Sequence, residues 1–221
     1  MVVPQRIKTI GDFIESGDVV VDVGADHGLL EVYLIAKYPN ITITAVENKI
    51  GPYKILERNL KAYKNVRLSL SDGLESVGKT TRTVVLAGMG GLNIKNILDA
   101  YPKKTKNLQK IIIDAHRDLN IARETILNYG FKINREKIVY EQDKFYVVTE
   151  FIKNETMVEQ NPDLIDIGYK LYEDELWPKY KEYLLLQNNI TIEKIKDIES
   201  MQDKVLSLKK MNERLTNYGK N

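Results

Sequence analysis

The stretch VVDVGADHGLLEVYL, residues Val20 to Leu34, joins three kinds of sequence in immediate succession. It begins as an apolar segment that predicts a buried strand, and it ends in a pattern with helical spacing. Between them lies a short turn that contains glycine and acidic residues. In an open α/β sheet such a turn faces the ligand, because ligands bind beyond the carboxyl ends of the strands. The segment therefore predicts an α/β fold with a binding site at this turn.

Short segments rich in Val, Ile and Leu alternate with helical patterns on both sides of this stretch. Strands are predicted at residues 19–23, 41–46, 66–70, 83–87 and 111–114. Helices are predicted at about residues 5–15, 29–37, 51–63, 92–100 and 120–129. Because strands alternate with helices, we expect a parallel sheet with helices on both faces.

A hairpin is predicted to close the edge of this sheet. Residues 131–152 alternate between apolar and polar on both sides of Gln142-Asp143-Lys144, which is typical of two antiparallel strands. A parallel sheet that ends in an antiparallel pair is one common methyltransferase arrangement, although doubly wound folds with other functions share most of it.

The pattern changes after residue 153, where a polar connector at residues 155–162 is followed by no further strand signal. Residues 176–198 and 201–218 both show helical periodicity, which predicts a helical hairpin. The second helix carries apolar residues at coiled-coil spacing: Met201, Val205, Leu208 and Leu215. We therefore expect a Rossmann-like domain over residues 1–153 and a helical hairpin, or coiled coil, over residues 154–221. Either a structural arm or a docking surface would account for the hairpin.

The composition narrows the class of protein. The chain has 221 residues, of which 43% are hydrophobic, no cysteine, and His27 and His116 as its two histidines. Disulfides and Cys-ligated metals are therefore excluded, and we expect no metal site. No run of about 18 apolar residues and no secretory signal occurs, so we expect a cytoplasmic protein that does not enter a membrane.

The charge is divided unevenly along the chain. Residues 1–153 carry 23 Lys and Arg against 18 Asp and Glu, whereas residues 154–221 carry 10 against 13. The basic first part is compatible with phosphate-bearing partners, and equally with an ordinary solvated surface.

The turn after the first strand fits one cofactor better than another. Asp26 stands where a dinucleotide-binding loop needs its second glycine, and a carboxylate there would repel a pyrophosphate. S-adenosylmethionine carries no phosphate but does carry a sulfonium and an ammonium, which acids attract. The spacing Asp22-x-Gly24 with Gly28 four residues further on matches the methyltransferase loop D-x-G-x-x-x-G. We therefore predict that the turn binds S-adenosylmethionine and that S-adenosylhomocysteine is the product.

Later strand ends support the same prediction. Glu47 ends the second strand, 23 residues after Gly24, where it can accept hydrogen bonds from both ribose hydroxyls. Ser71-Asp72-Gly73 follows the third strand and offers an acid to the adenine amino group, while the fourth strand runs into the small residues Leu86 to Gly91. Singly, each feature also fits a helix cap or a turn.

The chain lacks the residues of some methyl-transfer reactions. The Asn/Asp-Pro-Pro-aromatic motif of enzymes that methylate exocyclic adenine nitrogen would follow the fourth strand, but Ala87 to Gly91 occupies that place. Attack on a pyrimidine carbon needs a catalytic cysteine, which is absent. In-line transfer to a nitrogen or an oxygen, driven by positioning, remains.

Five segments of the chain together resemble one family. These are GDVVVDVGADHGLLEVYLI, AVENKIGPYKILERNL, LSDGL, VLAGMGG and NYGFKINREKIVYEQDKFYVVTEF. They are similar to the bacterial tRNA adenine-N1 methyltransferases that modify adenine 22 in the D-loop region, the TrmK family, over about residues 4–152 and on through the helical tail. The resemblance implies a Rossmann-like catalytic domain, S-adenosylmethionine as donor, tRNA as substrate and a C-terminal coiled coil.

The resemblance carries over to single residues. Asp22, Gly24, Asp26 and His27 match the family's D-I-G-S-D-H loop, with Gly28 where Ala is usual. Gly51-Pro52 matches the family's opening of the next helix. The predicted donor-binding residues, from motif and resemblance together, are Asp22, Gly24, Ala25, Asp26, His27, Gly28, Glu47, Asn48, Ser71, Asp72, Gly73, Gly88, Met89 and Gly90. The family typically reads Q-P-N after the fifth strand, whereas this chain has Asp114-Ala115-His116, so His116 either replaces that Asn or the Asn has another role.

Four residues are candidates for the chemistry at N1. The N1 atom has an in-plane lone pair, so a strong base is unnecessary, but a carboxylate near the base would stabilise the cationic product. Asp26 is the first candidate; the alternatives are that it caps the following helix or binds the donor's ammonium. His27 is expected to orient a group rather than carry a proton, and Tyr53 and His116 to stack on or bond to a flipped base.

RNA would be held by its backbone, because N1 lies on the pairing edge and the base must leave the helix. The predicted phosphate contacts are Arg6, Lys8, Lys54, Arg58, Lys61, Lys103, Lys104 and Lys106, with Lys110 beside the last group. We expect a monomer that binds tRNA. Two alternatives stay open: a methyltransferase for a small molecule or a protein, and a non-catalytic RNA-binding assembly factor.

Overall fold

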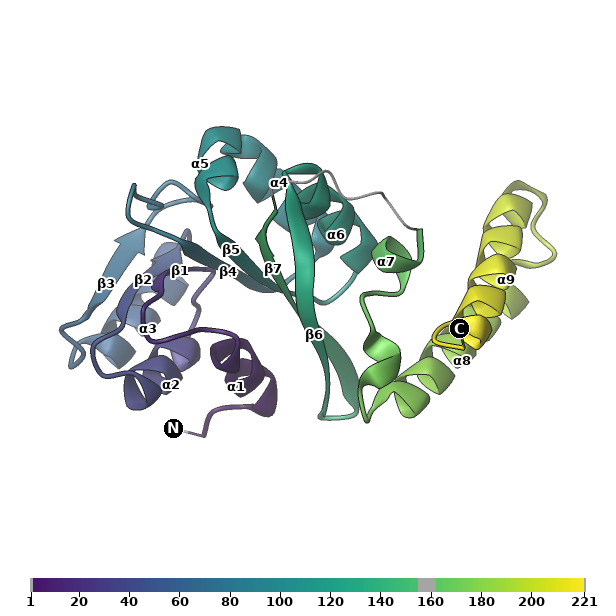
Figure 1. Cartoon of the computed structure of the whole chain (residues 1–221), viewed down its shortest axis with the longest axis horizontal. Coiled ribbons are helices and arrows are strands. Elements are labelled where there is room, and N and C mark those ends of the chain that lie inside the picture. The colour runs from purple at the N-terminus through teal and green to yellow at the C-terminus, as the bar shows by residue number, and fades with distance from the viewer. Residues whose placement is uncertain (1, 155–161, 221) are drawn as a thin grey trace.

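The computed structural model describes residues 2–154 and 162–220, and a seven-stranded sheet forms its centre (Figure 1). The strand order is β3-β2-β1-β4-β5-β7-β6, with β7 antiparallel to both of its neighbours. The strands are β1 (Val19–Val23), β2 (Thr42–Glu47), β3 (Val66–Leu70), β4 (Thr83–Met89), β5 (Lys110–Ala115), β6 (Phe131–Glu141) and β7 (Lys144–Lys153). The predicted parallel sheet with an antiparallel edge hairpin is therefore confirmed, and β7 rather than β6 pairs with β5.

Helices cover both faces of the sheet. The helical segments are α1 (Gln5–Asp12), α2 (Leu29–Lys37), α3 (Ile50–Leu60), α4 (Gly91–Ala100), α5 (Pro102–Asn107), α6 (Leu119–Asn128), α7 (Pro162–Asp166), η1 (Leu171–Glu173), α8 (Trp177–Ile195), η2 (Glu199–Met201) and α9 (Gln202–Asn217). The short segments α5, α7 and η1 were not predicted, because too few residues show a helical period there. The predicted connector lies almost wholly in residues 155–161, outside the described part of the chain.

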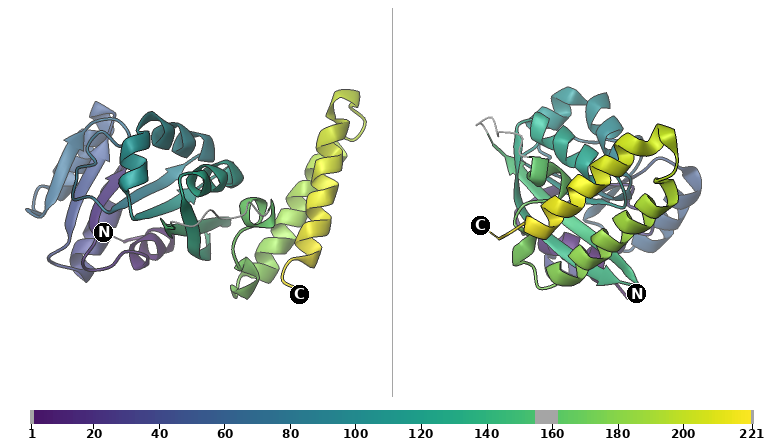
Figure 2. Two further views of the ribbon diagram at one scale, coloured as in Figure 1. Left: turned by 45° about the horizontal axis from the view of Figure 1, so that its top comes forward. Right: turned by 90° about the vertical axis from the view of Figure 1, so that its right-hand side faces the viewer.

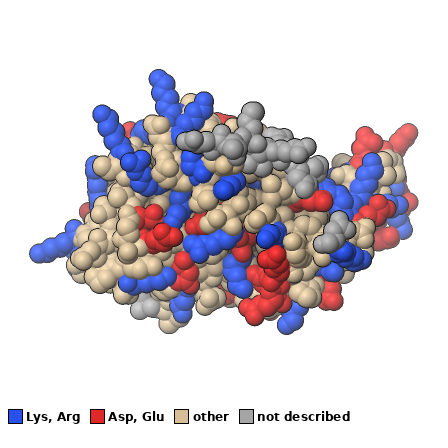
Figure 3. Space-filling model, viewed as in Figure 1, with Lys and Arg blue, Asp and Glu red and all other residues tan. Residues whose placement is uncertain are grey.

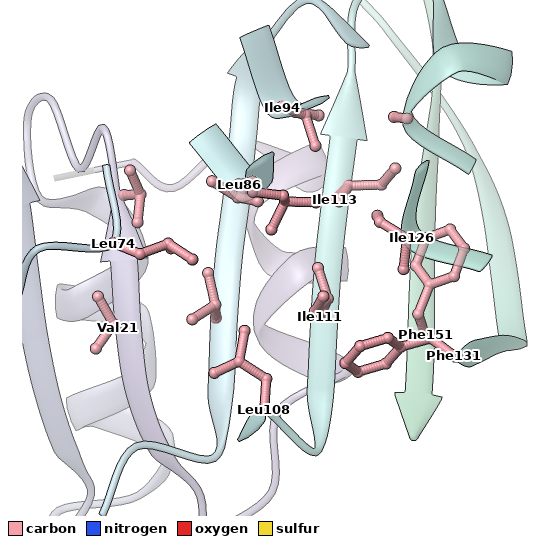
Figure 4. Packing of buried hydrophobic residues seen from close by; sticks show 14 of the residues in the cluster. Val21, Leu74, Leu86, Ile94, Leu108, Ile111, Ile113, Ile126, Phe131 and Phe151 are labelled. Carbon is pink, nitrogen blue, oxygen red and sulfur yellow. The ribbon is translucent and has the colours of Figure 1, made fainter. Parts of the chain in front are cut away.

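The side-chain alternation of the strands decides which helix covers which face. Val21, Leu86, Ile111 and Ile113 point to one face and pack with residues of α4 and α6, among them Ile94 and Ile126 (Figure 4). On the other face, Val20, Ile43, Val85 and Ile112 pack under α1 and α2. The helix α3 also lies on this second face, where Leu56 and Leu60 pack on Ala45. Because every central strand is buried on both faces, near-continuous runs of Val, Ile and Leu are required there.

The C-terminal helices α8 and α9 form the predicted hairpin and lie at the β6 end of the sheet, far from β3 (Figures 1 and 2). They pack side by side, and Trp177 and Leu215 join Ile138 and Val147 of the sheet hairpin in one buried cluster. Val205 and Leu215 of the predicted seam are buried, and Leu208 is half-buried. The prediction that Met201 belongs to the buried seam is wrong. Met201 lies in η2 with 43% of its surface exposed, because the chain is extended at Ile198 and α9 begins only at Gln202.

A buried ion pair joins the helical tail to the sheet. Arg123 of α6 and Glu136 of β6 are 1% and 0% exposed, and their closest nitrogen and oxygen are 2.7 Å apart. Arg123 also donates to the carbonyl of Ile165, and Glu136 accepts from Thr149 and from the amide of Tyr169. The chain after α7 is therefore held to the domain by hydrogen bonds as well as by apolar packing.

Candidate active site

The turn between β1 and α2 has a backbone that few side chains tolerate. Gly24 and Gly28 have φ angles of 81° and 77°, and Asp26 has φ of 49°. A Cβ at Gly28 would lie 2.9 Å from the Leu60 side chain, so this position needs glycine for space as well. The amides of Gly24 and Ala25 both donate to the carbonyl of Val46, at 2.9 and 3.0 Å, which ties the turn to the end of β2.

The first of two cavities at the carboxyl edge of the sheet lies beside α4 and is called the α4 cavity. It has a volume of about 340 Å³. Its lining consists mostly of strand-end residues and amide side chains: Val23, Gly24, Val46, Asn48, Lys49, Ser71, Asp72, Gly73, Met89, Asn93, Asn96 and Ile97. Asn48 donates to Asp72 at 3.1 Å, which joins the ends of β2 and β3. The α4 cavity thus offers hydrogen-bonding groups around an apolar floor.

Glu47 lies at the end of β2, between two residues that line the α4 cavity, Val46 and Asn48. It is buried, and its Oε1 accepts from the amides of Asn48 and Lys49 at 3.0 Å each. These bonds fix the carboxylate at the end of β2. Lys49, not Glu47, is the N-cap of α3, so the alternative that Glu47 caps this helix is wrong.

The second cavity lies under α1 and is called the α1 cavity; its volume is about 380 Å³. It shares Gly24 with the α4 cavity, so the two meet at the β1–α2 turn. Its lining carries more charge and comprises Pro4, Arg6, Ile7, Ile10, Asp22, Gly24, Ala25, Asp26, His27, Leu29, Leu30, Ala87, Gly88 and His116. The end of β4 contributes to both cavities: Ala87 and Gly88 line the α1 cavity and Met89 lines the α4 cavity, with a β-bulge between Ala87 and Met89.

Arg6, a predicted phosphate contact, is paired with a buried carboxylate. Its Nη1 lies 2.5 Å from Oδ2 of Asp114, which is 0% exposed, and its guanidinium lies over the Tyr146 ring. Nε2 of His116 is 3.5 Å from the same Oδ2. Oδ1 of Asp114 has no hydrogen-bond partner among the described residues. A phosphate could use Arg6 only by competing with a buried carboxylate, so we infer that Arg6 anchors α1 above the cavity.

Asp26 and His27 lie at the mouth of the α1 cavity. Their side chains are 65% and 53% exposed, and Nε2 of His27 is 3.5 Å from Oδ2 of Asp26. The alternative that Asp26 caps α2 is wrong, because Gly28 is the N-cap residue and no side-chain hydrogen bond caps the helix. A carboxylate that is exposed at the α1 cavity, on a residue with positive φ, is free to meet a ligand.

Asp22 lies deeper in the same cavity, against a second acid. Burial raises the pKa of Asp22 to about 7, although a hydrogen bond with Glu31 of α2 acts in the opposite direction. Burial, together with the charge of Asp22, raises the pKa of the Glu31 carboxyl well above its ordinary value. Glu31 was not predicted as a site residue, since its helical position gives no sign of its burial.

The structure brings together most of the predicted donor-binding residues. All of them line one of the two cavities except Glu47, Gly90 and, among the glycines of the turn, Gly28. Of the catalytic candidates, Asp26, His27 and His116 line the α1 cavity, whereas Tyr53 of α3 lines neither. Asn93 and Asn96 were missed; their i, i+3 spacing at the start of α4 was the available signal.

The predicted RNA contacts do not form one surface. Lys54, Arg58 and Lys61 are exposed on or beside α3, on one face of the sheet. Lys103, Lys104 and Lys106 belong to α5, which packs with α4 on the other face and leads to the amino end of β5. The ammonium of Lys104 donates to the carbonyls of Leu74 and Glu75. Figure 3 shows basic side chains projecting where α5 lies and acidic ones at the far tip of the helical hairpin.

Among residues 2–154 and 162–220, no three His, Asp or Glu side chains come together in a way that could hold a metal ion. Within the same described residues, none of the helices combines the length and the apolar character needed to cross a bilayer.

The fold and the two cavities define a class of protein. The sequence profile of the family described as "Methyltransferase domain" matches residues 3–149, so the chain belongs to this family. Among curated proteins, it is 29% identical over 148 residues to the tRNA (adenine(22)-N(1))-methyltransferase of Bacillus subtilis strain 168, a match that covers 65% of this chain and 62% of the relative. The match therefore spans less than two thirds of that relative's length.

Solved structures extend the likeness to the helical tail. The B. subtilis m1A22 tRNA methyltransferase TrmK superposes with a TM-score of 0.79 at 23% identity, covering 96% of this chain and 97% of the other. The M. capricolum TrmK in complex with S-adenosyl-homocysteine gives 0.83 at 22% identity, covering 99% and 98%. The Rossmann-like methyltransferase fold with C-terminal helices is confirmed, and so is the resemblance to the TrmK family.

Proposed function

We propose that the chain is an S-adenosylmethionine-dependent methyltransferase that methylates N1 of an adenine in tRNA, at position 22 by analogy with its relatives. The observation that carries the proposal is the pair of cavities that meet at Gly24. One has the hydrogen-bonding lining that an adenosine moiety needs, and the other has the acids that attract a cationic sulfur compound. The similarity to the B. subtilis enzyme supports tRNA as the substrate.

The residues present fit this donor. Asn48, Ser71, Asp72 and Gly73 would hold the adenosine part in the α4 cavity, with Glu47 beside it at the end of β2. Asp22 and the turn from Gly24 to His27 would hold the methionine part in the α1 cavity. When bound, S-adenosylmethionine supplies a methyl group that its positive sulfur makes electrophilic.

The α1 cavity provides what a flipped adenine requires. The N1 lone pair can attack without a base, so these residues have to orient the ring and stabilise the positive charge that it gains. Asp26 is the carboxylate placed for that stabilisation, and His27 stands 3.5 Å from it. His116 lines the same cavity and is oriented by Asp114, the carboxylate that also holds Arg6. Tyr53 of α3 lines neither cavity.

The tRNA must present this adenine unpaired, and exposed basic side chains can hold the backbone around it. Lys54 lies on the first turns of α3, after the carboxyl end of β2, while Arg6, which lines the α1 cavity, is paired with Asp114. Lys103 and Lys106 lie toward the opposite edge of the sheet, so an RNA that uses both groups has to pass around the domain. We also propose that the protein acts in the cytoplasm and as a monomer. Sedimentation of the free protein and of its tRNA complex can test the oligomeric state.

One assay tests the reaction and its alternatives. The protein is incubated with a radiolabelled methyl donor and unmodified bulk tRNA, the RNA is digested, and 1-methyladenosine is sought. Labelled 1-methyladenosine is the expected product. Turnover on a small molecule or a protein without RNA would favour the other enzyme class, while tRNA binding without any label in the RNA would favour an assembly factor.

A further inference from the structure

Glu31 is a buried acid whose charge the structure does not balance. It lies in the first turn of α2 and is 0% exposed. No donor from another described residue meets Oε1 or Oε2 in hydrogen-bonding geometry. An ionised carboxylate in such a place costs several kcal/mol unless a proton or a cation compensates it.

Asp22 is the neighbouring acid whose charge disfavours ionisation of the Glu31 carboxyl. It is 5% exposed, belongs to β1 and lines the α1 cavity, while Glu31 stands behind it on α2. Two carboxyl groups in contact cannot both be ionised at low cost, so one proton held between them is the favoured state. A protonated Glu31 can donate a hydrogen bond to the Asp22 carboxylate. This bond gives one Glu31 oxygen the partner that it otherwise lacks.

No cation of the described chain is available to neutralise the pair. The charged groups that face the cavity from neighbouring elements are Arg6 of α1, Asp26 and His27 of the turn, and His116 after β5. The guanidinium of Arg6 is paired with Asp114, and His116 is close to the same carboxylate. The imidazole of His27 faces Asp26 at the exposed mouth of the cavity.

We propose that Glu31 and Asp22 form a proton-sharing pair that recognises the ammonium group of the methyl donor, and that donor binding expels the shared proton to solvent. The inference rests on the proposed function, because it takes S-adenosylmethionine as the donor. The ammonium replaces the proton as the positive charge beside the pair, so one proton leaves as one ammonium arrives and no bond to carbon changes. Glu31 is thus a positioning residue that acts through Asp22. The raised pKa values of both carboxyls agree with a proton held there at neutral pH.

Calorimetry tests the proposal on the full chain without catalysis. S-adenosylhomocysteine, which carries the ammonium, is titrated at pH 6.5 in two buffers that differ in ionisation enthalpy. The wild-type protein should release a fraction of a proton, on the order of 0.5 per ligand, and should bind about tenfold more tightly at pH 7.5 than at pH 5.5. 5′-Methylthioadenosine has the adenosine but no ammonium, and it should bind without proton release.

Substitutions assign the proton to the pair. Glu31→Gln keeps the size of the side chain but cannot share a proton as an acid, so its binding of S-adenosylhomocysteine should release almost no proton. Glu124→Gln, on the exposed side of α6, is the matched control and should behave as wild type. Circular dichroism checks that each variant is folded.

The outcomes separate the inference from the proposed function. Failure of folded wild-type protein to bind S-adenosylhomocysteine would refute the proposed function itself. Binding without proton release, or equal release with 5′-methylthioadenosine, would overturn the inference alone, and this result needs no variant. Proton release that persists in folded Glu31→Gln would assign the proton to Asp22 alone, or to another group such as His27 or His116, and would also overturn the proton-sharing pair.

Discussion

The molecule contains two pairs of buried ionisable groups that differ in their surroundings. Between Arg123 and Glu136, at the junction of sheet and helical tail, opposite charges meet and further donors and acceptors come from Ile165, Thr149 and Tyr169. Between Asp22 and Glu31, at the carboxyl edge, two acids meet and Glu31 receives no donor from another described residue. The first pair is complete within the chain, whereas the second requires something from outside.

This difference separates a structural role from a binding role. A buried charge that the fold fully compensates stabilises one arrangement of the chain, and removing a partner damages that arrangement. A buried charge that is left uncompensated lowers the stability of the free protein and raises its affinity for whatever supplies the missing charge. The comparison can be tested by substitutions that act on one pair or the other.

The largest effect is expected at the junction. Glu136→Ala leaves the Arg123 guanidinium buried without its carboxylate, and the free energy of unfolding should fall by about 3–5 kcal/mol in urea titrations. Glu173→Ala, which removes an exposed carboxylate 3.7 Å from Lys170, should cost less than about 1 kcal/mol. If Glu136→Ala lowered the free energy of unfolding as little as Glu173→Ala does, the buried pair of Arg123 and Glu136 would contribute little to stability. The contrast between the two buried pairs would then be wrong.

At the carboxyl edge, Asp22→Ala should affect binding rather than folding. Calorimetry should show at least about a hundredfold loss of affinity for S-adenosylhomocysteine, because the acid proposed to meet the ligand's ammonium is gone. The melting temperature of the free protein should not fall, since a buried acid that no described cation compensates has been removed. Unfolding of this variant at the temperature where wild type is intact would show that Asp22 is structural.

Asp26 sharpens the distinction between binding and chemistry at one edge of the sheet. Asp26→Ala should slow methyl transfer to tRNA about thirtyfold, while the affinity for S-adenosylhomocysteine changes about threefold. The reason is that the Asp26 carboxylate lines the α1 cavity, where the target base is proposed to bind. Single-turnover rates and calorimetry give the two numbers. Equal losses would identify Asp26 as a ligand of the donor only.

The pH dependence of stability gives a smaller effect with a definite sign. The pKa of Asp22 is raised from 3.8 to about 7 on folding. The unfolded chain therefore loses this proton at lower pH than the native protein, and the contribution of the pair to stability falls as the pH rises through that interval. Glu31→Gln should flatten this dependence and gain about 1 kcal/mol on wild type at pH 7.5 relative to pH 4, measured by urea unfolding. Parallel curves for the two proteins would contradict a shared proton.

The smallest effects are expected from the exposed basic side chains. Replacing Lys54, Arg58 and Lys61 by Gln should weaken tRNA binding only about threefold near physiological salt and should reduce the salt dependence of binding. The double replacement of Lys103 and Lys106, toward the other edge of the sheet, should have less effect. Filter binding over a range of salt concentrations measures both, and a larger effect for the α5 pair would place the RNA on the opposite face.

The sequence was sufficient for those parts of the molecule that depend on local periodicity. Strands such as 83–87 were predicted because buried parallel strands need continuous Val, Ile and Leu, and the turn from Gly24 to Gly28 because its backbone needs glycine. The face on which a helix meets the sheet was not predictable in this way. Glu31 has the sequence context of an ordinary acid in a first helical turn, and only the depth at which α2 packs makes it a buried group.

Pairings between distant residues were equally beyond sequence reasoning. Arg6 and Asp114 are separated by 108 positions, and no local spacing indicates that one charge neutralises the other. Arg6 was therefore assigned to phosphate on charge alone. The same limit explains why Lys103 and Lys54 were grouped as RNA contacts although they lie on opposite faces of the sheet.

The position of α1 has a practical consequence for work on this protein. The roof of the α1 cavity is made by Pro4, Arg6 and Ile7, and the amide of Gln5 donates to Glu141 at 2.8 Å near the tip of the sheet hairpin. An affinity tag joined directly before Pro4 would leave the molecule beside the α1 cavity, the proposed site of the methionine part of the donor and of the target base. A tag that follows α9 avoids this cavity, and proteins with the two tag placements should be compared before any rate is interpreted.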